Sequence, residues 1–139
     1  MRLQRAFTFS ELLIAVAVLA MLAAAAVPRF IAINSEVRTG AVEALAANVQ
    51  SSAHLTNRIW LSNGQPARMI ADGQPLEMRF GYPTESSIDE IVINSGDFIF
   101  KDGYFKHREL LSKQGCAVLY VPPSNPQSSP VVIPYTNGC

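Results

Sequence analysis

The sequence predicts an α+β fold, in which one long N-terminal helix packs on a small antiparallel β-sheet. Three observations support this prediction. An uncharged apolar run covers residues 12–27, and apolar residues then recur at intervals of three or four as far as residue 60. Beyond residue 66, short alternating or β-branched segments are separated by glycine and proline. The first two patterns are typical of a continuous helix, and the third is typical of strands joined by turns.

Length and charge allow one modest domain. The chain has 139 residues, with 11 Lys and Arg against 11 Asp and Glu. A nucleic-acid-binding protein would normally be basic, so we do not expect nucleic acid as a partner. The predicted parts are a leader over residues 1–6, an apolar helix over 7–30, the amphipathic half of the same helix over 31–62 and a β-rich head over 63–139.

The apolar run is long enough to cross a membrane once residues 7–10 are added to it. Arg2 and Arg5 precede the run and are expected to keep the N-terminus in the cytoplasm. Glu11 stands at its entrance, and a carboxylate costs about 2.5–3.5 kcal/mol at the centre of a bilayer. We therefore expect Glu11 to have a positively charged partner.

Two other interpretations of this segment are a secretory signal peptide and a plain membrane anchor. Ala23 and Ala25 satisfy the A-x-A pattern of a signal-peptidase site. Cleavage there would release a secreted binding module. Glu11 and the continuation of the helical pattern through Arg29 argue against that cleavage, because a discarded signal peptide needs neither feature.

The N-terminal residues resemble those of a type IV prepilin. Ala6 precedes Phe7-Thr8, Glu11 follows, and Val27-Pro28-Arg29-Phe30 closes the apolar run. The resemblance implies that a prepilin peptidase cuts between Ala6 and Phe7 and that the new amino terminus at Phe7 is methylated. The family usually has Gly in place of Ala6, and this departure is expected to slow processing more than to abolish it.

The same resemblance implies a life cycle for the chain. The chain would sit in the bacterial inner membrane as a single-pass protein and later polymerise with other pilin subunits into an extracellular fibre. The implied partners are an inner-membrane assembly platform with its ATPase and an outer-membrane secretin. A pseudopilin of a type II secretion system, which forms a short periplasmic piston, is the alternative within the same superfamily.

The apolar helix has the features expected of a filament core. Because it is apolar on every side, lipid or other helices must surround it. Its alanines let helix backbones approach closely, while its larger residues supply contact area. The ammonium of a free Phe7 is expected to neutralise Glu11 of an adjacent subunit or of its own chain. Pro28 has no N–H to give the carbonyl of Ala24, so a kink or a frayed turn is expected there.

After residue 31, an amphipathic stripe predicts the second half of the helix, and this stripe is expected to face a sheet of the same chain. Its members are Val37, Ala41, Val42, Leu45, Val49, Ala53 and Ile59-Trp60. The Asn63-Gly64 pair is expected to end the helix.

In the head, we predict a hairpin over 69–80 that turns at Asp72-Gly73 and is followed by a break at Gly81-Tyr82-Pro83. A helix is predicted from Thr84 through Ile93, and strands are predicted over 97–100 and 117–121.

The chain has two cysteines, Cys116 and Cys139, and both are in a part that is expected to lie outside the inner membrane. We therefore predict that they form a disulfide, which closes a C-terminal loop. Free thiols or a redox pair are the alternatives. The disulfide would stabilise the head by about 3 kcal/mol.

The segment that these cysteines enclose, together with Gly81-Tyr82-Pro83, resembles the mannose-sensitive hemagglutinin (MSHA) branch of type IV pilins. That resemblance implies a fibre for surface attachment, to an abiotic or carbohydrate surface. Four prolines are expected to stiffen an exposed loop, which is either a contact surface or a passive solvated loop: Pro122, Pro123, Pro126 and Pro130.

Other chemistry is sparse, and we expect neither an enzyme nor a bound cofactor. His54 and His107 lack a second ligand at metal spacing, so no metal site is predicted. Asp97, Asp102 and Gly103 resemble a calcium loop faintly, and turns explain them better. One basic and aromatic cluster is a candidate for binding DNA, but a solvated face with core aromatics is the better interpretation. Its members are Lys101, Tyr104, Phe105, Lys106, His107, Arg108 and Lys113.

Overall fold

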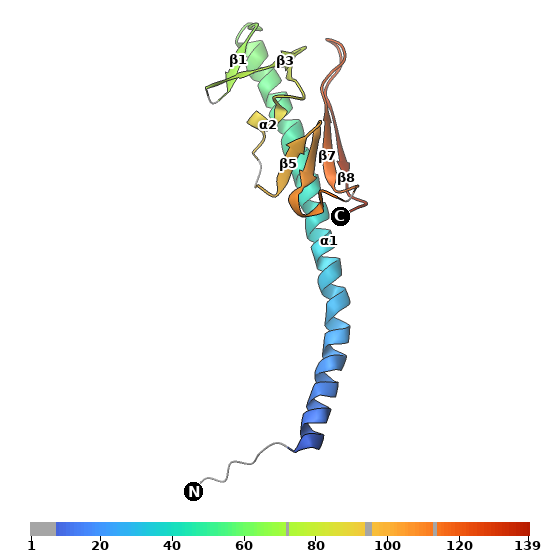
Figure 1. Cartoon of the computed structure of the whole chain (residues 1–139). Helices are drawn as coiled ribbons and strands as arrows, with labels where there is room; N and C mark the ends of the chain where they lie inside the picture. The colour runs from blue at the N-terminus through green and yellow to red at the C-terminus, as the bar shows by residue number, and fades with distance from the viewer. Residues whose placement is uncertain (1–7, 72, 94–95, 113) are drawn as a thin grey trace. The chain divides into compact units, whose positions relative to one another are not determined.

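The computed structural model describes residues 8–71, 73–93, 96–112 and 114–139, without the side chains of residue 28 and residues 30–32 (Figure 1). The chain divides into two compact units, Met1–Glu36 and Val37–Cys139. The elements are α1 (Phe9–Ser62), β1 (Met69–Ala71), β2 (Gln74–Leu76), β3 (Met78–Arg79), β4 (Tyr82–Pro83), α2 (Ile88–Ile91), β5 (Phe98–Lys101), β6 (Tyr104–His107), the 3-10 helix η1 (Arg108–Leu110), β7 (Ala117–Val121) and β8 (Val131–Tyr135). The predicted α+β class is confirmed.

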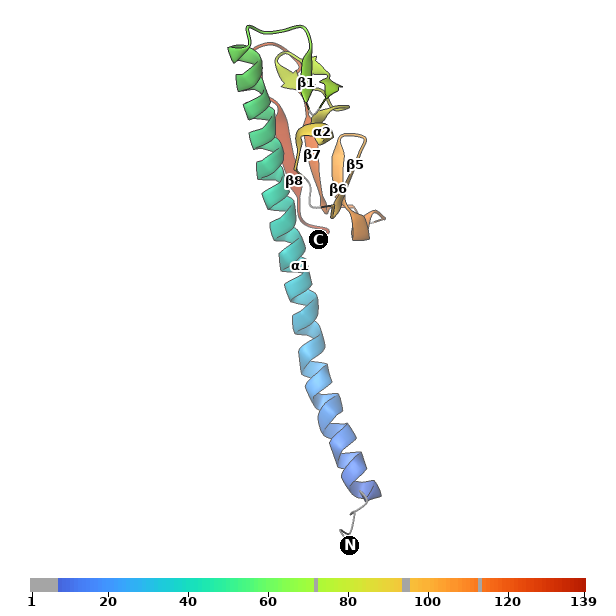
Figure 2. The same cartoon turned by 90° about the vertical axis from the view of Figure 1, so that its left-hand side faces the viewer.

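The second half of α1 packs on an antiparallel sheet, and this interface is the core of the second unit. Figures 1 and 2 both show the strands lying along this part of the helix. Val42 and Val49 of the helix are fully buried against Phe105 and Val118 of the sheet. Leu45, Ala46 and Ala53 complete the buried helical stripe.

The buried stripe of α1 is shorter than the sequence pattern predicted. Val37 is 64% exposed and Ile59 is 42% exposed. Both residues lie beyond the turns of α1 whose side chains belong to the core cluster, which runs from Val42 to Ala53. The expectation that they face the sheet was wrong, because periodicity alone does not tell how far a covering sheet extends.

The end of α1 was predicted correctly, whereas the expected frayed turn at Pro28 is not found. The Gln65 amide donates to the Trp60 carbonyl at 2.9 Å, and Gly64 has a φ of +77°, which closes the helix. The backbone is helical through Pro28 without interruption. Proline removes only one helical hydrogen bond, and the alanines at 23–26 that precede it are strong helix formers.

The main sheet has four antiparallel strands in the order β5-β6-β7-β8. The prediction of β7 over 117–121 is confirmed, and β5 begins one residue later than expected. Strands β6 and β8 were not predicted. Strand β6 carries charged side chains next to buried Phe105, and β8 contains Pro134, which an edge strand tolerates.

The hairpin predicted over 69–80 is in fact two hairpins. β1 pairs with β2 around the turn at Gly73, as expected, while Asp72 lies outside the described residues. β3 pairs instead with β4, and Phe80 and Gly81 form the turn with φ of +51° and +83°. Positive φ at both central residues is the hallmark of a tight two-residue hairpin turn. Gly81 therefore turns the chain where a break was predicted.

The helix expected from Thr84 to Ile93 is shorter than predicted. α2 covers only Ile88–Ile91, with Ser87 at its N-cap position and no side-chain cap bond there. Thr84 contributes its carbonyl, which accepts from the Ile88 amide at 3.1 Å, so residues 84–88 form a turn before the helix. The serines and threonine of this stretch bond to one another and to Glu77 instead of extending the helix.

Candidate functional site

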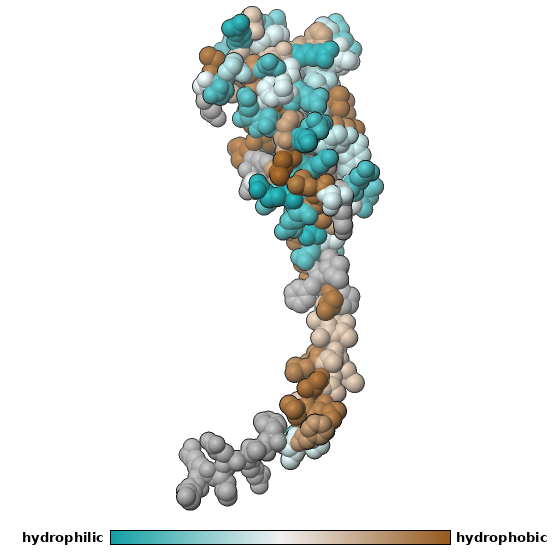
Figure 3. Space-filling view, viewed as in Figure 1, coloured by the Kyte–Doolittle hydropathy of each residue, from teal (hydrophilic) through white to brown (hydrophobic). Residues whose placement is uncertain are grey.

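The first half of α1 is an exposed apolar helix. The segment Phe9–Val27 has 19 residues and a mean hydropathy of 2.4, and none of it is buried within the chain. By length and composition alone, it is the one helix in the described part of the chain that is suited to crossing a membrane. Figure 3 shows hydrophobic residues along this segment on the face that it draws. Surface of this kind requires lipid or another protein as its surroundings.

A hydrogen-bonded box formed by Thr8 and Glu11 begins α1. The Thr8 amide and the Thr8 hydroxyl both donate to Oε2 of Glu11 at 2.8 Å, and the Glu11 amide donates to the Thr8 hydroxyl at 3.3 Å. This reciprocal pattern is a capping box, which satisfies backbone donors that the first helical turn leaves open. The capping box was not predicted, although its signal is present in the sequence as Thr-x-x-Glu.

The capping box gives Glu11 a role within its own chain, which is distinct from the predicted role between chains. The processing residues Ala6 and Phe7 lie outside the described residues. Both bonds from Thr8 end on the same carboxylate oxygen, Oε2. A carboxylate has acceptor capacity for a further cationic donor while it holds these two bonds.

A shallow groove of about 290 Å³ runs along the apolar part of α1. It is lined by Phe9, Leu12, Leu13, Val16, Ala17 and Ala20. The two alanines form the C-terminal end of this lining, where their small side chains leave space for a side chain from another helix. Apolar helices in membranes associate through small residues of this kind, which let their backbones approach.

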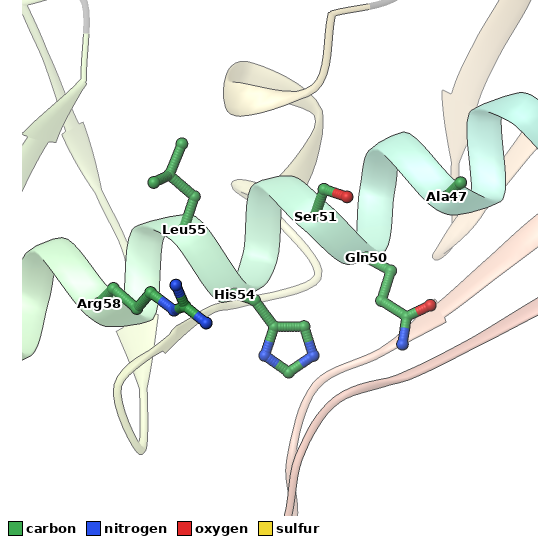
Figure 4. Close-up of a pocket in the computed structure, with 6 residues that line it drawn as sticks. All are labelled: Ala47, Gln50, Ser51, His54, Leu55 and Arg58. Atoms are coloured by element: carbon green, nitrogen blue, oxygen red, sulfur yellow. The ribbon is translucent and has the colours of Figure 1, made fainter.

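A second uncovered surface lies on α1 within the head. A depression of about 650 Å³ follows the helix and is lined by Ala47, Gln50, Ser51, His54, Leu55 and Arg58. Figure 4 shows Gln50 and His54 on one side of the helix and Leu55 on the other. Leu55 is 60% exposed, and the ring centres of His54 and Tyr82 lie 5.7 Å apart in an edge-to-face arrangement. The lining of this depression therefore mixes polar groups with uncovered apolar area.

The predicted disulfide between Cys116 and Cys139 is confirmed, with an S–S distance of 2.07 Å. The segment that it closes contains two paired strands, because β7 and β8 pair along five residues each. Pro123 and Pro130 are buried, so the expectation of a wholly exposed proline-stiffened loop was wrong. The closure is tight: the Gly138 amide donates to the Gly115 carbonyl at 2.8 Å.

Tyr120 of β7 connects the sheet to the β3–β4 hairpin. Its side chain is 1% exposed, and its hydroxyl donates to the carbonyl of Pro83 at 2.8 Å. Burial, and to a smaller extent the neighbouring phenol of Tyr82, raises the pKa of Tyr120 well above its usual value. The head thus depends on this phenol remaining protonated.

The basic and aromatic cluster considered for DNA does not form one surface. Phe105 is 1% exposed and belongs to the core, and Lys113 lies outside the described residues. Arg108 donates from Nε to the carbonyl of Gly96 at 3.0 Å. Lys106 places its ammonium 5.6 Å from the ring centre of Tyr104. Alternation along β6 places Phe105 on the core face and Tyr104 and Lys106 on the opposite face.

The segment that resembles a calcium loop is the turn between two strands. Asp102 and Gly103 have φ of +52° and +78° and join β5 to β6. Among the residues that the structure describes, no three His, Cys, Asp or Glu side chains gather closely enough to hold a metal ion.

The comparison with protein families agrees with the geometry at the start of the chain. Residues 1–27 match the family model described as the prokaryotic N-terminal methylation motif. No curated protein and no solved structure matches the chain. With its capped, exposed apolar helix, the chain carries the prepilin-type N-terminal methylation motif of the type IV pilin and pseudopilin family.

Proposed function

We propose that this protein is a structural subunit of a type IV pilus, which polymerises through its apolar helix into an extracellular fibre for surface attachment. The observation that carries the proposal is the methylation motif over residues 1–27, together with a 19-residue hydrophobic segment, Phe9–Val27, that no described residue of the chain buries. A helix of this kind has two stable environments, the lipid bilayer and a bundle of similar helices. A pilin uses both in turn.

Processing is proposed to occur between Ala6 and Phe7. A prepilin peptidase removes residues 1–6 with Arg2 and Arg5, and the new amino terminus of Phe7 is methylated. Thr8 then becomes the second residue of the mature chain, directly before the capped helix. The capping box ties Glu11 to Thr8, and Glu11 is only four positions after the new amino terminus in the sequence, so both charges belong to the same end of the mature chain.

Assembly is proposed to pair these charges between subunits. The ammonium of Phe7 approaches Glu11 of a neighbouring helix, and each group removes the penalty of burying the other. The groove around Ala17 and Ala20 supports close packing of the same helices. Pro28 is proposed as the position at which the helix adapts to the filament, since it lacks one backbone donor. The inner-membrane assembly platform, its ATPase and the outer-membrane secretin are the partners of this step.

The head supports a fibre that works outside the cell. The Cys116–Cys139 disulfide is of the kind that forms and persists in oxidising compartments. It ties the end of the chain to β7 and so protects a small domain against unfolding. This feature favours an attachment pilus of the MSHA type over a pseudopilin, which is the second candidate because it uses the same N-terminal motif.

Electron microscopy distinguishes the two candidates. Cells that produce the wild-type chain are sheared, and the released material is imaged after labelling with an antibody to the head. A pilus subunit gives long labelled surface fibres, which disappear in cells lacking the gene. Label confined to the periplasm, with no sheared fibres at wild-type expression, would support the pseudopilin instead.

A further inference from the structure

The face of the sheet that points away from α1 carries a pocket of about 680 Å³. Strand register explains its position. Phe105 and Val118 are paired across β6 and β7 and face the core, so their neighbours along each strand face the other way. Lys106, Ala117 and Tyr135 are consecutive partners across β6, β7 and β8 and form one row on this outer face. The pocket has the volume of an ordinary small-ligand site.

Aromatic rings form one wall of this pocket, and a small residue leaves room in front of them. The rings of Tyr104 and Tyr135 lie 6.4 Å apart, tilted by 37°. Tyr135 is 36% exposed, while Ala117 beside it is 6% exposed and has only a methyl group. A flat apolar ring face next to a shallow floor suits the C–H face of a sugar ring. The amide side chains of Gln114 and Asn137 line the same pocket and offer both donors and acceptors to hydroxyl groups.

The charge of the pocket is positive. Lys106 holds its ammonium over the ring of Tyr104, 5.6 Å from the ring centre, and the neighbouring Tyr135 is partly exposed. Of the described residues that line the pocket, none is acidic. A ligand that brings a carboxylate would therefore meet a lysine without competing with a protein carboxylate in the pocket.

We propose that this pocket binds an acidic pyranose, a hexuronate unit of a polysaccharide. The sugar ring lies against Tyr135, its carboxylate accepts from Lys106, and its hydroxyls bond to the amides of Gln114 and Asn137. Binding of this kind would give the proposed attachment function a ligand class, acidic polysaccharide. The inference rests on the proposed function only for its biological role, because the binding itself does not require a fibre. Binding itself is measured on single subunits, so its failure would leave the filament proposal standing, and a failure to form fibres would leave this binding result intact.

To test this, tetragalacturonate is titrated into the full chain in detergent, and binding is measured by calorimetry. The matched control ligand is the same oligosaccharide with its carboxylates methyl-esterified, which keeps the ring faces and hydroxyls but removes the charge. We expect tetragalacturonate to bind and the esterified form to bind at least about tenfold more weakly, the usual effect of losing a charge-assisted hydrogen bond. Equal affinity for the two ligands, or binding of neither, would overturn the proposal.

Variants locate the binding site. Lys106→Gln is expected to weaken tetragalacturonate binding about tenfold or more. Lys101→Gln is the matched control, because Lys101 lies on the same sheet outside the pocket and changes the net charge equally. Tyr135→Ala is expected to weaken binding about fivefold, and Tyr135→Phe to leave it within about twofold, since the ring is kept. An equal loss in Lys101→Gln and Lys106→Gln would show general charge attraction and refute the pocket.

Discussion

Replacing Glu11 separates the two roles that this carboxylate is given. Within its own chain, Glu11 accepts the Thr8 amide and hydroxyl at 2.8 Å. Glutamine can keep this box, because its amide oxygen accepts the same bonds, whereas alanine loses it at a cost of about 1 kcal/mol. Between chains, the proposed partner is the ammonium of Phe7, and only a carboxylate neutralises it. Glu11→Gln therefore removes the charge and retains the cap.

The magnitudes of the two roles differ enough to be told apart. Leaving a buried ammonium without its partner costs about 3–5 kcal/mol, or more than a hundredfold in the assembly equilibrium. Loss of the cap alone costs about 1 kcal/mol, which is roughly fivefold. We expect Glu11→Gln and Glu11→Ala to abolish fibres to a similar extent. Thr8→Val, which removes the hydroxyl of the box and leaves the carboxylate in place, is expected to reduce fibre yield only moderately.

The assay is the amount of subunit in sheared fibres, measured by immunoblot and divided by the amount in the membrane fraction. Membrane levels serve as the control, because all three variants should still insert. Wild-type fibre yield from Glu11→Gln would refute the charge-pairing argument and leave Glu11 as a helix cap. A Thr8→Val yield as low as that of Glu11→Ala would show that the cap is the dominant role.

Three further predictions concern the head. Replacing Cys116 and Cys139 by alanine should lower the free energy of unfolding by about 3 kcal/mol, measured by denaturant titration, and a reductant should then have no further effect. Tyr120→Phe removes the donor to the buried Pro83 carbonyl and should cost about 1–3 kcal/mol in the same titration. Because folding raises the pKa of Tyr120, the contribution of its protonated phenol to stability is complete below about pH 10 and is lost as the pH rises above that value. Tyr120→Phe should therefore lose less stability at alkaline pH than the wild type. Identical pH profiles for the two proteins would contradict this explanation. Phe105→Ala empties a core position that is 1% exposed and should cost about 3–5 kcal/mol, so a change below about 1 kcal/mol would mean that the sheet does not pack there as described.

The sequence predicted features that local chemistry decides. The helix stop at Asn63-Gly64, strand β7 and the pairing of the two cysteines were all recoverable. Each depends on a strong local signal: a glycine with positive φ, a run of β-branched and aromatic residues, or an even cysteine count.

Features decided by long-range partners were missed. Strand β6 contains Lys106 and His107, and it is a strand because β5 and β7 pair on either side of it. Strand β8 contains Pro134, and it exists because the edge of a sheet accepts a residue without an N–H. The pocket around Tyr135 is assembled from β6, β7, β8 and the residues near the disulfide, so no single stretch of sequence signals it.

The most direct test of the account is the intact mass of the subunit taken from sheared surface fibres. The account predicts a chain that begins at Phe7, lacks residues 1–6 and carries one added methyl group on its terminal amine, with the Cys116–Cys139 disulfide intact. A chain that begins near Val27 would contradict it, because cleavage there removes the apolar helix on which assembly depends. A chain in the fibres that still begins at Met1 would contradict it equally.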